Sequence, residues 1–367
     1  MAIKISSHIA SITPYSPGKP IEELERELGI TGAIKLASNE NPCGPSPRAL
    51  AVLAAAEPSL HRYPDGGGHV LRRALAQHLK VTPHQILLGN GSDEVIGLLT
   101  KAFLEPDDEA IVAEPSFVVY ATDVMASRAK PVRVPLTQHR HDLPAMAKAI
   151  GPKTRMIFIC NPNNPTGTYV TASEVSAFMQ SVPPDVIVVF DEAYFEYVTA
   201  LDYPDTLPLL AGGRNIVVLR TFSKIYGLAG LRIGYGVTTP EITQHLNRIR
   251  PPFNTNSLAQ KAALAALEDH EHVQESRRVN LEGRQFLTER LQALSLTVVP
   301  SETNFLYFDA RQDGKALFDA LLQQGVIVRH LGGSYLRVTI GLAHENRRFV
   351  DALQFVLSQK RKENRLP

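Results

Sequence analysis

The sequence predicts an α/β protein with a large, doubly wound, mostly parallel sheet and a smaller α/β domain after it. Short apolar runs recur along the first two thirds of the chain, and they are continuous, as expected of strands buried on both faces of a parallel sheet. Segments with helical periodicity separate these runs. After Pro251-Pro252 the pattern changes to long helical stretches followed by further short strands, which indicates a second domain.

The expected strands of the large sheet are the apolar runs at residues 86–88, 110–112, 156–160, 186–190 and 215–219. An apolar stripe at helical spacing, beginning at Val95, predicts a helix after the first run, with Ser92 as its N-cap. Ser46 followed by proline predicts another helix start, with the helix over residues 48–56.

Beyond residue 250 we expect helices over residues 257–267 and 276–294, a last helix over about 345–357, and strands near residues 296–299, 305–308, 326–328 and 336–340. A further helix is expected at residues 21–28. The predicted divisions are an N-terminal arm (1–35) that packs with the small domain or a partner subunit, a large domain (36–250) and a small C-terminal domain (251–367).

The composition excludes several classes of protein. With 367 residues, 44% hydrophobic and 20% charged, the chain is typical of a globular protein with room for two domains. Its 38 basic and 37 acidic residues are well mixed, so neither nucleic acid nor a membrane surface is an expected partner. Cys43 and Cys160 lack the spacing of a disulfide framework or a metal site, and no metal is expected. Without a recognisable signal peptide or membrane span, the cytoplasm is the expected location.

Polar residues follow three of the predicted strands, at 161–167, 191–194 and 220–224. In open parallel sheets, ligands bind beyond the carboxyl ends of the strands. Lys224 lies in a turn of short residues, with Arg232 eight positions on, and a Schiff-base lysine needs burial or a nearby positive charge to become nucleophilic. Arg232 can supply that charge and can also bind a phosphate. Taken alone, Lys224 fits a surface loop equally well.

Asp191 ends a fully apolar strand, where an unpaired carboxylate is costly, so it is expected to have a positive partner such as a protonated ring nitrogen. A helix cap or a salt-bridged core aspartate is the alternative. Residues 161–167 can form a simple turn. Residues 89–94 open a helix after a strand, where bare amides bind phosphate, and the missing third glycine and Walker lysine favour a monophosphate over NAD or ATP.

In this order along the chain, the motifs resemble the fold type I pyridoxal-phosphate aminotransferases, in particular the histidinol-phosphate aminotransferase family. The resemblance runs through nearly the whole chain and is specific for fold and cofactor only because all its motifs occur together. Those motifs are residues 14–20, 36–42, 62–65, 89–94, 115–117, 161–167, 191–194, 221–234 and 336–341.

The resemblance implies pyridoxal 5′-phosphate as the cofactor and Lys224, Asp191 and Tyr194 as catalytic residues. Lys224 matches the lysine that forms a Schiff base and moves the proton of the substrate carbon. Asp191 matches the carboxylate that keeps the ring nitrogen protonated. The remaining implied cofactor contacts are Asn164 and Tyr194 at the ring hydroxyl, Phe117 on the ring face, and Ser92, Asp93, Thr221, Ser223 and Arg232 at the phosphate.

Arg329 and Arg337 match residues that bind the anionic end of the substrate, and Tyr15 and Asn39 are implied as further substrate contacts. Alternation along strand 336–340 turns Arg337 away from the apolar side, and a solvated surface arginine is the alternative. The connection between Arg329 and Arg337 is shorter than the resemblance leads us to expect. Tyr63 resembles a residue that reaches the phosphate in the neighbouring subunit, which implies a homodimer with shared sites.

The implied activity is a ping-pong aminotransferase of histidine biosynthesis, which interconverts L-histidinol phosphate and 2-oxoglutarate with imidazole-acetol phosphate and L-glutamate. An aromatic amino-acid aminotransferase or a threonine-phosphate decarboxylase would keep the same cofactor. A cofactor-binding protein without turnover, or the effector domain of a regulator, is disfavoured because Lys224, Asp191 and Arg232 are all present.

Overall fold

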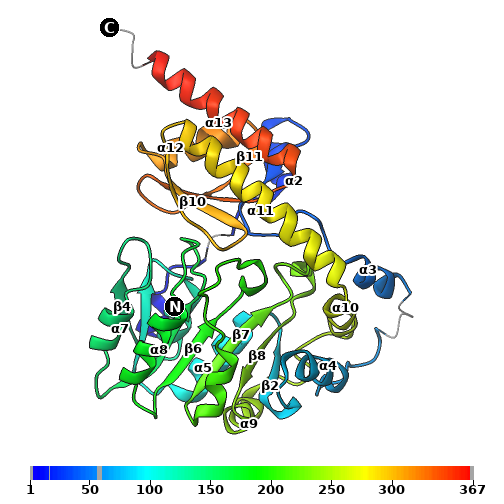
Figure 1. Ribbon diagram of the computed structural model, residues 1–367, viewed down its shortest axis with the longest axis vertical. Helices are drawn as coiled ribbons and strands as arrows, with labels where there is room; N and C mark the ends of the chain where they lie inside the picture. Colours follow the sequence, from blue (N-terminus) through cyan, green and yellow to red (C-terminus); the bar gives the residue numbers. More distant parts are fainter. Residues whose placement is uncertain (1–2, 16, 56–59, 364–367) are drawn as a thin grey trace.

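The computed structural model describes residues 3–15, 17–55 and 60–363. They form two layered bodies, which Figure 1 shows one above the other. The larger body is built around a seven-stranded sheet and the smaller one around a four-stranded sheet. Both combine strands with helices, so the predicted α/β class is confirmed.

The seven-stranded sheet is mostly parallel. In spatial order its strands are β2 (Ile86–Gly89), β8 (Gly234–Thr238), β7 (Ile216–Thr221), β6 (Ile187–Asp191), β5 (Thr154–Cys160), β3 (Glu109–Glu114) and β4 (Lys130–Pro135). Strand β8 runs antiparallel to both neighbours, and the other neighbouring pairs are parallel. Each predicted run of this sheet is a strand. Strands β4 and β8 were not predicted, because the first is an edge strand interrupted by two prolines and two charged residues and the second contains two glycines.

Helices cover both faces of this sheet. One apolar core includes α5 (Ser92–Phe103), α6 (Val119–Ala126) and α9 (Pro240–Ile249). The core on the other face includes α3 (Pro47–Ala54), α4 (His69–Leu79), α7 (Leu143–Lys148), α8 (Ala172–Ser181) and α10 (Ser257–Leu267). Along β5, Phe158 belongs to the first core and Ile157 to the second. Burial on both faces explains why the predicted runs were continuously apolar.

The two predicted helix starts have different outcomes. Ser46 caps α3 as predicted, because its Oγ accepts a hydrogen bond from the amide of Ala49 at 3.3 Å. The predicted end of that helix at Ala56 lies outside the described residues. The prediction that Ser92 caps α5 was wrong by one residue, since the N-cap is Gly91 at φ 81°, a value that favours glycine. No side chain caps α5 in the described part of the chain, so its first amides are open.

The four-stranded sheet is antiparallel, with the spatial order β12 (Arg329–His330), β13 (Tyr335–Thr339), β10 (Phe305–Asp309) and β9 (Thr297–Val299). Helices α11 (His270–Ala293), α12 (Gly314–Gln323) and α13 (Ala343–Glu363) cover one face. Leu336 and Val338 point into that core, whereas Arg337 points to the opposite face, toward the large sheet. Arg337 is only 8% exposed, so it is not a solvated surface arginine.

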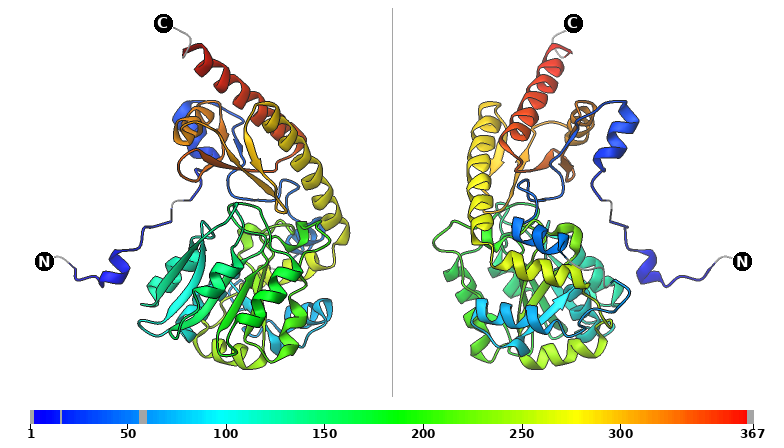
Figure 2. Two further views of the ribbon diagram at one scale, coloured as in Figure 1. Left: turned by 60° about the vertical axis from the view of Figure 1, so that its left-hand side comes forward. Right: turned by 90° about the vertical axis from the view of Figure 1, so that its right-hand side faces the viewer.

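The N-terminal segment packs against the small body. The predicted helix is α2 (Ile21–Leu28), and β1 (Ile34–Lys35) pairs in parallel with β11 (Val326–Ile327). Leu24 shares a small apolar core with Ile327. Before α2, the chain leaves the small body and carries α1 (Ser7–Ala10), which lies beside α6 of the large body. Figure 2 shows this segment at the outer edge of the molecule. The short 3₁₀ helices are η1 (Pro83–Gln85), η2 (Phe195–Tyr197), η3 (Leu207–Gly212) and η4 (Ala229–Leu231).

The predicted division of the chain after residues 35 and 250 stays a prediction. Helix α10, which follows residue 250, packs against α3 and α4 of the large body. Helix α11 runs along both bodies in Figure 1 and joins them. Among the described residues, no helix is long and apolar enough to cross a bilayer.

Candidate active site

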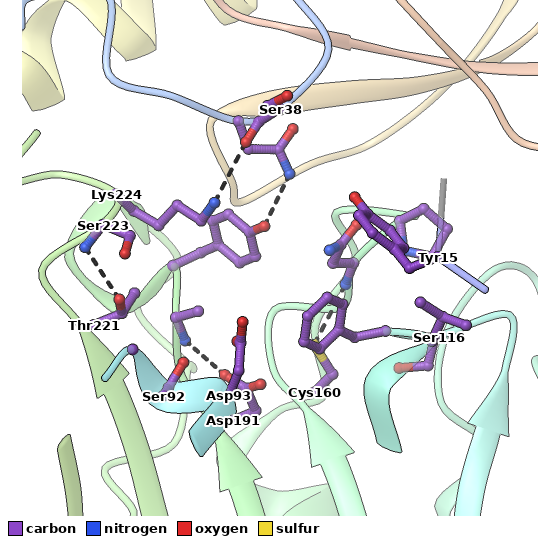
Figure 3. A pocket seen from close by; sticks show the side chains of 18 of the residues that line it. Tyr15, Ser38, Ser92, Asp93, Ser116, Cys160, Asp191, Thr221, Ser223 and Lys224 are labelled. Carbon is purple, nitrogen blue, oxygen red and sulfur yellow. Dashed lines mark hydrogen bonds between the residues drawn. The ribbon is translucent and has the colours of Figure 1, made fainter. Parts of the chain in front are cut away.

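A pocket of about 420 Å³ lies beyond the carboxyl ends of β5, β6 and β7, where the large sheet meets the inner face of the small one. Figure 3 shows Lys224 on one side of it, Tyr15 on the other and Asp191 at the floor. Every predicted site residue except Tyr63 lines this pocket: Tyr15, Asn39, Ser92, Asp93, Phe117, Asn164, Asp191, Tyr194, Thr221, Ser223, Lys224, Arg232, Arg329 and Arg337.

Lys224 follows β7 and extends its ammonium group into the pocket. Its Nζ lies 3.5 Å from the carbonyl oxygen of Ser38 and 5.8 Å from the centre of the Tyr194 ring. Burial lowers the pKa of Lys224 to about 8, and the positive charge of Arg337 lowers it further than that of Arg232. Arg232 lowers the pKa of Lys224 as the sequence suggested, but Arg337 from the small sheet, which the sequence did not link to Lys224, has the larger effect. With a pKa of about 8, part of Lys224 is the neutral and nucleophilic amine near physiological pH, far more than for a lysine in water.

Asp191 ends β6 at the floor of the pocket. Its Oδ2 accepts a hydrogen bond from the Tyr120 hydroxyl at 2.6 Å, and its Oδ1 accepts one from the amide of Ala193 at 3.1 Å. In the part of the chain that the structure describes, Asp191 forms no ion pair and caps no helix. It is therefore neither the helix cap nor the salt-bridged core aspartate that the sequence left open. Burial raises the pKa of the Asp191 carboxyl to about 6. A cation that entered the pocket would stabilise the ionised form.

The amino end of α5 forms one wall. Its open amides lie beside Arg232, and a Cβ atom on Gly91 would come within 2.4 Å of the Arg232 guanidinium. Arg232 contacts Asp93 Oδ2 and Ser223 Oγ, each at 3.4 Å. The amide of Ser223 donates to Thr221 Oγ1 at 3.0 Å. Backbone amides, hydroxyls and a guanidinium group thus converge, which suits an anion such as phosphate.

Two arginines of the small sheet form the opposite wall. Arg329 and Arg337 are directly paired across β12 and β13, so their side chains lie on the same face. Arg337 donates to the carbonyl of Ala37 at 2.7 Å and to Asn164 Oδ1, while its Nε has no hydrogen-bond partner among the described residues. The Arg329 guanidinium lies 5.5 Å from the centre of the Tyr15 ring. A donor left over on a buried arginine is a contact available to a ligand.

The short connection between these arginines is a tight hairpin. The amide of Leu331 donates to the carbonyl of Tyr335 at 3.0 Å, and Gly332 and Gly333 at the tip have φ values of 93° and 53°. Because the hairpin is closed so tightly, Arg329 stays opposite Arg337 and lines the pocket despite the short connection.

Asn39 and Tyr194 connect the two sheets at the back of the pocket. Asn39 Nδ2 donates to the Tyr194 hydroxyl at 2.9 Å, and its amide donates to Thr339 Oγ1 of β13 at 3.0 Å. Burial raises the pKa of the Tyr194 hydroxyl, which therefore stays protonated. The structure assigns Asn39 contacts within the protein, and these orient Tyr194.

Comparison with known proteins agrees with this geometry. The family described as Aminotransferase class I and II matches residues 31–353. The histidinol-phosphate aminotransferase of Moorella thermoacetica is 51% identical over 362 residues, covering 97% of this chain and 93% of that protein. Histidinol-phosphate aminotransferase 1 of Nitrosococcus oceani is 47% identical over 357 residues, covering 96% of each. The chain belongs to the histidinol-phosphate aminotransferases, within the class I and II aminotransferases.

Solved structures confirm the fold of this aminotransferase. Histidinol-phosphate aminotransferase from Sinorhizobium meliloti, solved in complex with pyridoxal-5′-phosphate, superimposes with a TM-score of 0.90 at 29% identity, covering 98% of this chain and 99% of that one. Aspartate aminotransferase from Thermus thermophilus, solved with maleate, shares the fold with a TM-score of 0.82 at 22% identity, covering 96% and 98%. The predicted fold type I architecture is therefore confirmed.

The sequence reasoning missed part of the aminotransferase site. Tyr120, which donates to Asp191, lies inside α6, and its ring packs edge-on against that of Phe117, which precedes the helix. Ser38, Ser116 and Cys160 also line the pocket. Tyr63 lies outside it, 81% exposed, with its ring stacked on that of Phe253 at 4.6 Å.

Proposed function

We propose that this aminotransferase interconverts L-histidinol phosphate and 2-oxoglutarate with imidazole-acetol phosphate and L-glutamate, a step of histidine biosynthesis, with pyridoxal 5′-phosphate as cofactor. The observation that carries the proposal is the meeting of Lys224, Asp191 and the paired arginines 329 and 337 in one pocket. The names of relatives at 51% and 47% identity support the choice of substrate.

The residues present fit pyridoxal 5′-phosphate. Asp191 is a buried carboxylate with no cationic partner among the described residues, as a site for a protonated pyridine nitrogen requires. The open amides of α5 and the Arg232 guanidinium offer a phosphate site. Lys224, with its lowered pKa, supplies an amine that can react with an aldehyde. A pocket of about 420 Å³ is of the size that small-molecule ligands use.

We propose the following roles at the cofactor. Ser92, Thr221, Ser223 and Arg232 would hold the phosphate, together with the amide of Asp93, and Phe117 would lie on the ring face; Asn164 and Tyr194 would bind the ring hydroxyl. When bound, the cofactor supplies an electron sink for the electrons released at the substrate carbon. Tyr120 would hold Asp191 by its hydrogen bond of 2.6 Å, so that the carboxylate faces the ring nitrogen.

Lys224 is the proposed general base and acid. Its neutral amine would take the proton from the substrate Cα and then, as an ammonium group, give it up on the cofactor side of the bond. Arg337, which belongs to the small sheet, lowers the pKa of the Lys224 amine. The neutral form is therefore populated at lower pH than it would be in water. Tyr194, oriented by Asn39, keeps its hydroxyl on the same side of the pocket as Lys224.

Arg329 and Arg337 are the proposed site for the anionic end of the substrate. Two guanidinium groups on one face suit a phosphate dianion better than a single carboxylate, and the unpartnered Nε of Arg337 gives one further donor. Tyr15, whose ring lies under Arg329, would close this end of the pocket. Glutamate would use the same arginines through its carboxylate in the other half-reaction.

The proposal includes three further predictions, on the assembly, the roles of the two domains and the location of the enzyme. Tyr63, exposed in the single chain, would reach the phosphate site of a second copy and make the enzyme a homodimer with shared sites. The large domain at residues 36–250 would carry the cofactor, and residues 251–367 the substrate arginines. The enzyme would work in the cytoplasm, where the free thiols of Cys43 and Cys160 stay reduced.

Steady-state kinetics test the proposal. With 2-oxoglutarate as acceptor, kcat/KM is expected to be much larger for L-histidinol phosphate than for L-phenylalanine or L-tyrosine, and no CO2 should be released from L-threonine phosphate. Equal kcat/KM values for the aromatic amino acids would reassign the substrate. Turnover by a Lys224→Ala variant would overturn the mechanism, because no other amine lines the pocket in the described residues.

A further inference from the structure

The chain from the end of β2 to the start of α5, residues 89–91, is packed so closely that it has little room to move. A Cβ atom on Gly234 of the neighbouring strand β8 would lie 2.4 Å from the amide of Ser92, and one on Gly89 would lie 2.6 Å from the carbonyl of Gly91. The open amides of α5 therefore depend on how this loop is held. The side chains that hold it by hydrogen bonds do not line the pocket.

Glu94 makes the central contact of that support. Its Oε2 accepts a hydrogen bond from the amide of Asn90 at 2.7 Å and another from Asn254 Nδ2 at 2.5 Å. Glu94 does not line the pocket, so it is not a ligand contact. It is the third residue of α5, the position at which a glutamate reaches back to the chain before a helix in a capping box.

Helix α8 shows the complete form of that motif in the same protein. There Glu174 accepts from the amide of Thr171 at 2.7 Å, while Thr171 Oγ1 covers the amide of Glu174 at 3.3 Å. In α5 the N-cap is Gly91, which has no side chain to cover the amides, and Glu94 reaches one residue further back, to the amide of Asn90. The arrangement fixes the chain before the helix and leaves its first amides free.

Asn254 fixes Glu94 in turn. Besides its bond to Glu94, Nδ2 of Asn254 donates to the carbonyl of Leu88 at the end of β2 at 3.1 Å. Its Oδ1 accepts from Arg250 at 2.6 Å. Asn254, which lies before α10, is therefore hydrogen-bonded both to the end of strand β2 and to the Glu94 carboxylate of α5.

We propose that Glu94, held by Asn254, is a positioning residue for the cofactor phosphate. It fixes the loop so that the amides of α5 and the Arg232 guanidinium face one point. This inference rests on the proposed function, because it assumes that the phosphate binds at that wall. It follows that loss of Glu94 weakens ligands with a phosphate selectively, whereas a purely structural residue would weaken all ligands alike.

The test uses apoenzyme titrated with pyridoxal 5′-phosphate and, in parallel, with pyridoxal, which lacks the phosphate. Binding is followed by absorbance, and the ratio of the two Kd values is compared between variants. Glu94→Ala is expected to weaken pyridoxal 5′-phosphate about 10- to 100-fold, the usual effect of losing charge-assisted hydrogen bonds, and to leave the Kd for pyridoxal nearly unchanged. Glu94→Gln keeps the acceptor oxygen and should restore the wild-type ratio.

Glu174→Ala is the matched control, since it removes a helix-start glutamate from a helix, α8, that does not line the pocket. It should leave the Kd ratio unchanged. An unchanged ratio in Glu94→Ala, or an equal loss for both ligands, would overturn the inference. If Glu94→Ala does not fold, Asn254→Ala decides by the same ratio. A wild-type enzyme without preference for the phosphate-bearing ligand would instead overturn the proposed function.

Discussion

Lys224 and Arg337 share the pocket as two cations, and within the described residues neither forms an ion pair. They come from different sheets, Lys224 from the loop after β7 and Arg337 from β13. Burial lowers the pKa of both groups, and Arg337 lowers the pKa of Lys224 further. The small sheet therefore sets the basicity of an amine that the large sheet carries.

Replacing Arg337 with glutamine should raise the pKa of Lys224, because the second largest cause of its lowering disappears. The neutral amine is the reactive form, so labelling of Lys224 in the apoenzyme by an amine-reactive reagent should rise as the pH passes about 8 in the wild type and at higher pH in the variant. Arg329→Gln is the control, since Arg329 is not among the main causes of the shift. Coinciding titration midpoints for wild type and Arg337→Gln would contradict this coupling.

Asp191→Asn should make the apoenzyme more stable while it weakens cofactor binding. Burial raises the pKa of Asp191 from 3.8 to about 6. A raised pKa stabilises the fold at low pH and costs stability as the pH rises through 6, here by up to about 3 kcal/mol. The gain of the variant should therefore reach about 3 kcal/mol at pH 8 and about half of that at pH 5, where the carboxyl is mostly protonated in the folded protein but ionised in the unfolded chain. Urea unfolding at both values checks it, with the exposed Asp185→Asn as control; a variant less stable than wild type at pH 8 would refute it.

Much of the site followed from local sequence. A buried parallel strand requires a continuous apolar run, so the ends of β5, β6 and β7 could be read directly, and with them Asn164, Asp191 and Lys224. The resemblance of all the motifs to one aminotransferase family then indicated that these polar residues share a single cofactor site. All of them line one pocket, as the rule for ligand sites in parallel sheets predicts.

What the sequence could not reveal depends on contacts between distant residues. Tyr120 meets Asp191 across 71 positions, and nothing in its own helix distinguishes it from a core tyrosine. The effect of Arg337 on Lys224 depends on how closely the two sheets approach. Strand β8 has weak strand propensity and exists because β2 and β7 pair with it on both sides.

Beside the catalytic aspartate, Arg220 and Glu192 form a buried ion pair at 2.9 Å. The Arg220 guanidinium also lies 3.5 Å from the centre of the Phe195 ring. Arg220→Met should destabilise the fold by about 3–5 kcal/mol, because it leaves the Glu192 carboxylate buried without its partner. The double variant Arg220→Met with Glu192→Gln should recover part of this loss, since no uncompensated charge remains.

Urea unfolding of the single and double variants measures the effect. The exposed pair Lys315 and Asp319, at 2.5 Å, is the control, and Lys315→Met should cost less than about 1 kcal/mol. If the double variant is no more stable than Arg220→Met, the loss comes from packing around Phe195 and not from the unpaired charge.

Subunit mixing tests whether Tyr63 completes the site of a second copy. In the single chain Tyr63 is 81% exposed and lies outside the pocket, so Tyr63→Ala should leave the chain folded. If sites are shared, Tyr63→Ala and Lys224→Ala each give a poorly active enzyme, yet a hybrid dimer contains one site with both residues intact. Refolding an equal mixture should therefore restore about a quarter of wild-type activity, because half of the dimers are hybrids with one competent site each. Activity equal to the mean of the separate variants would mean that Tyr63 acts within its own chain or not at all, and the shared-site homodimer would have to be abandoned.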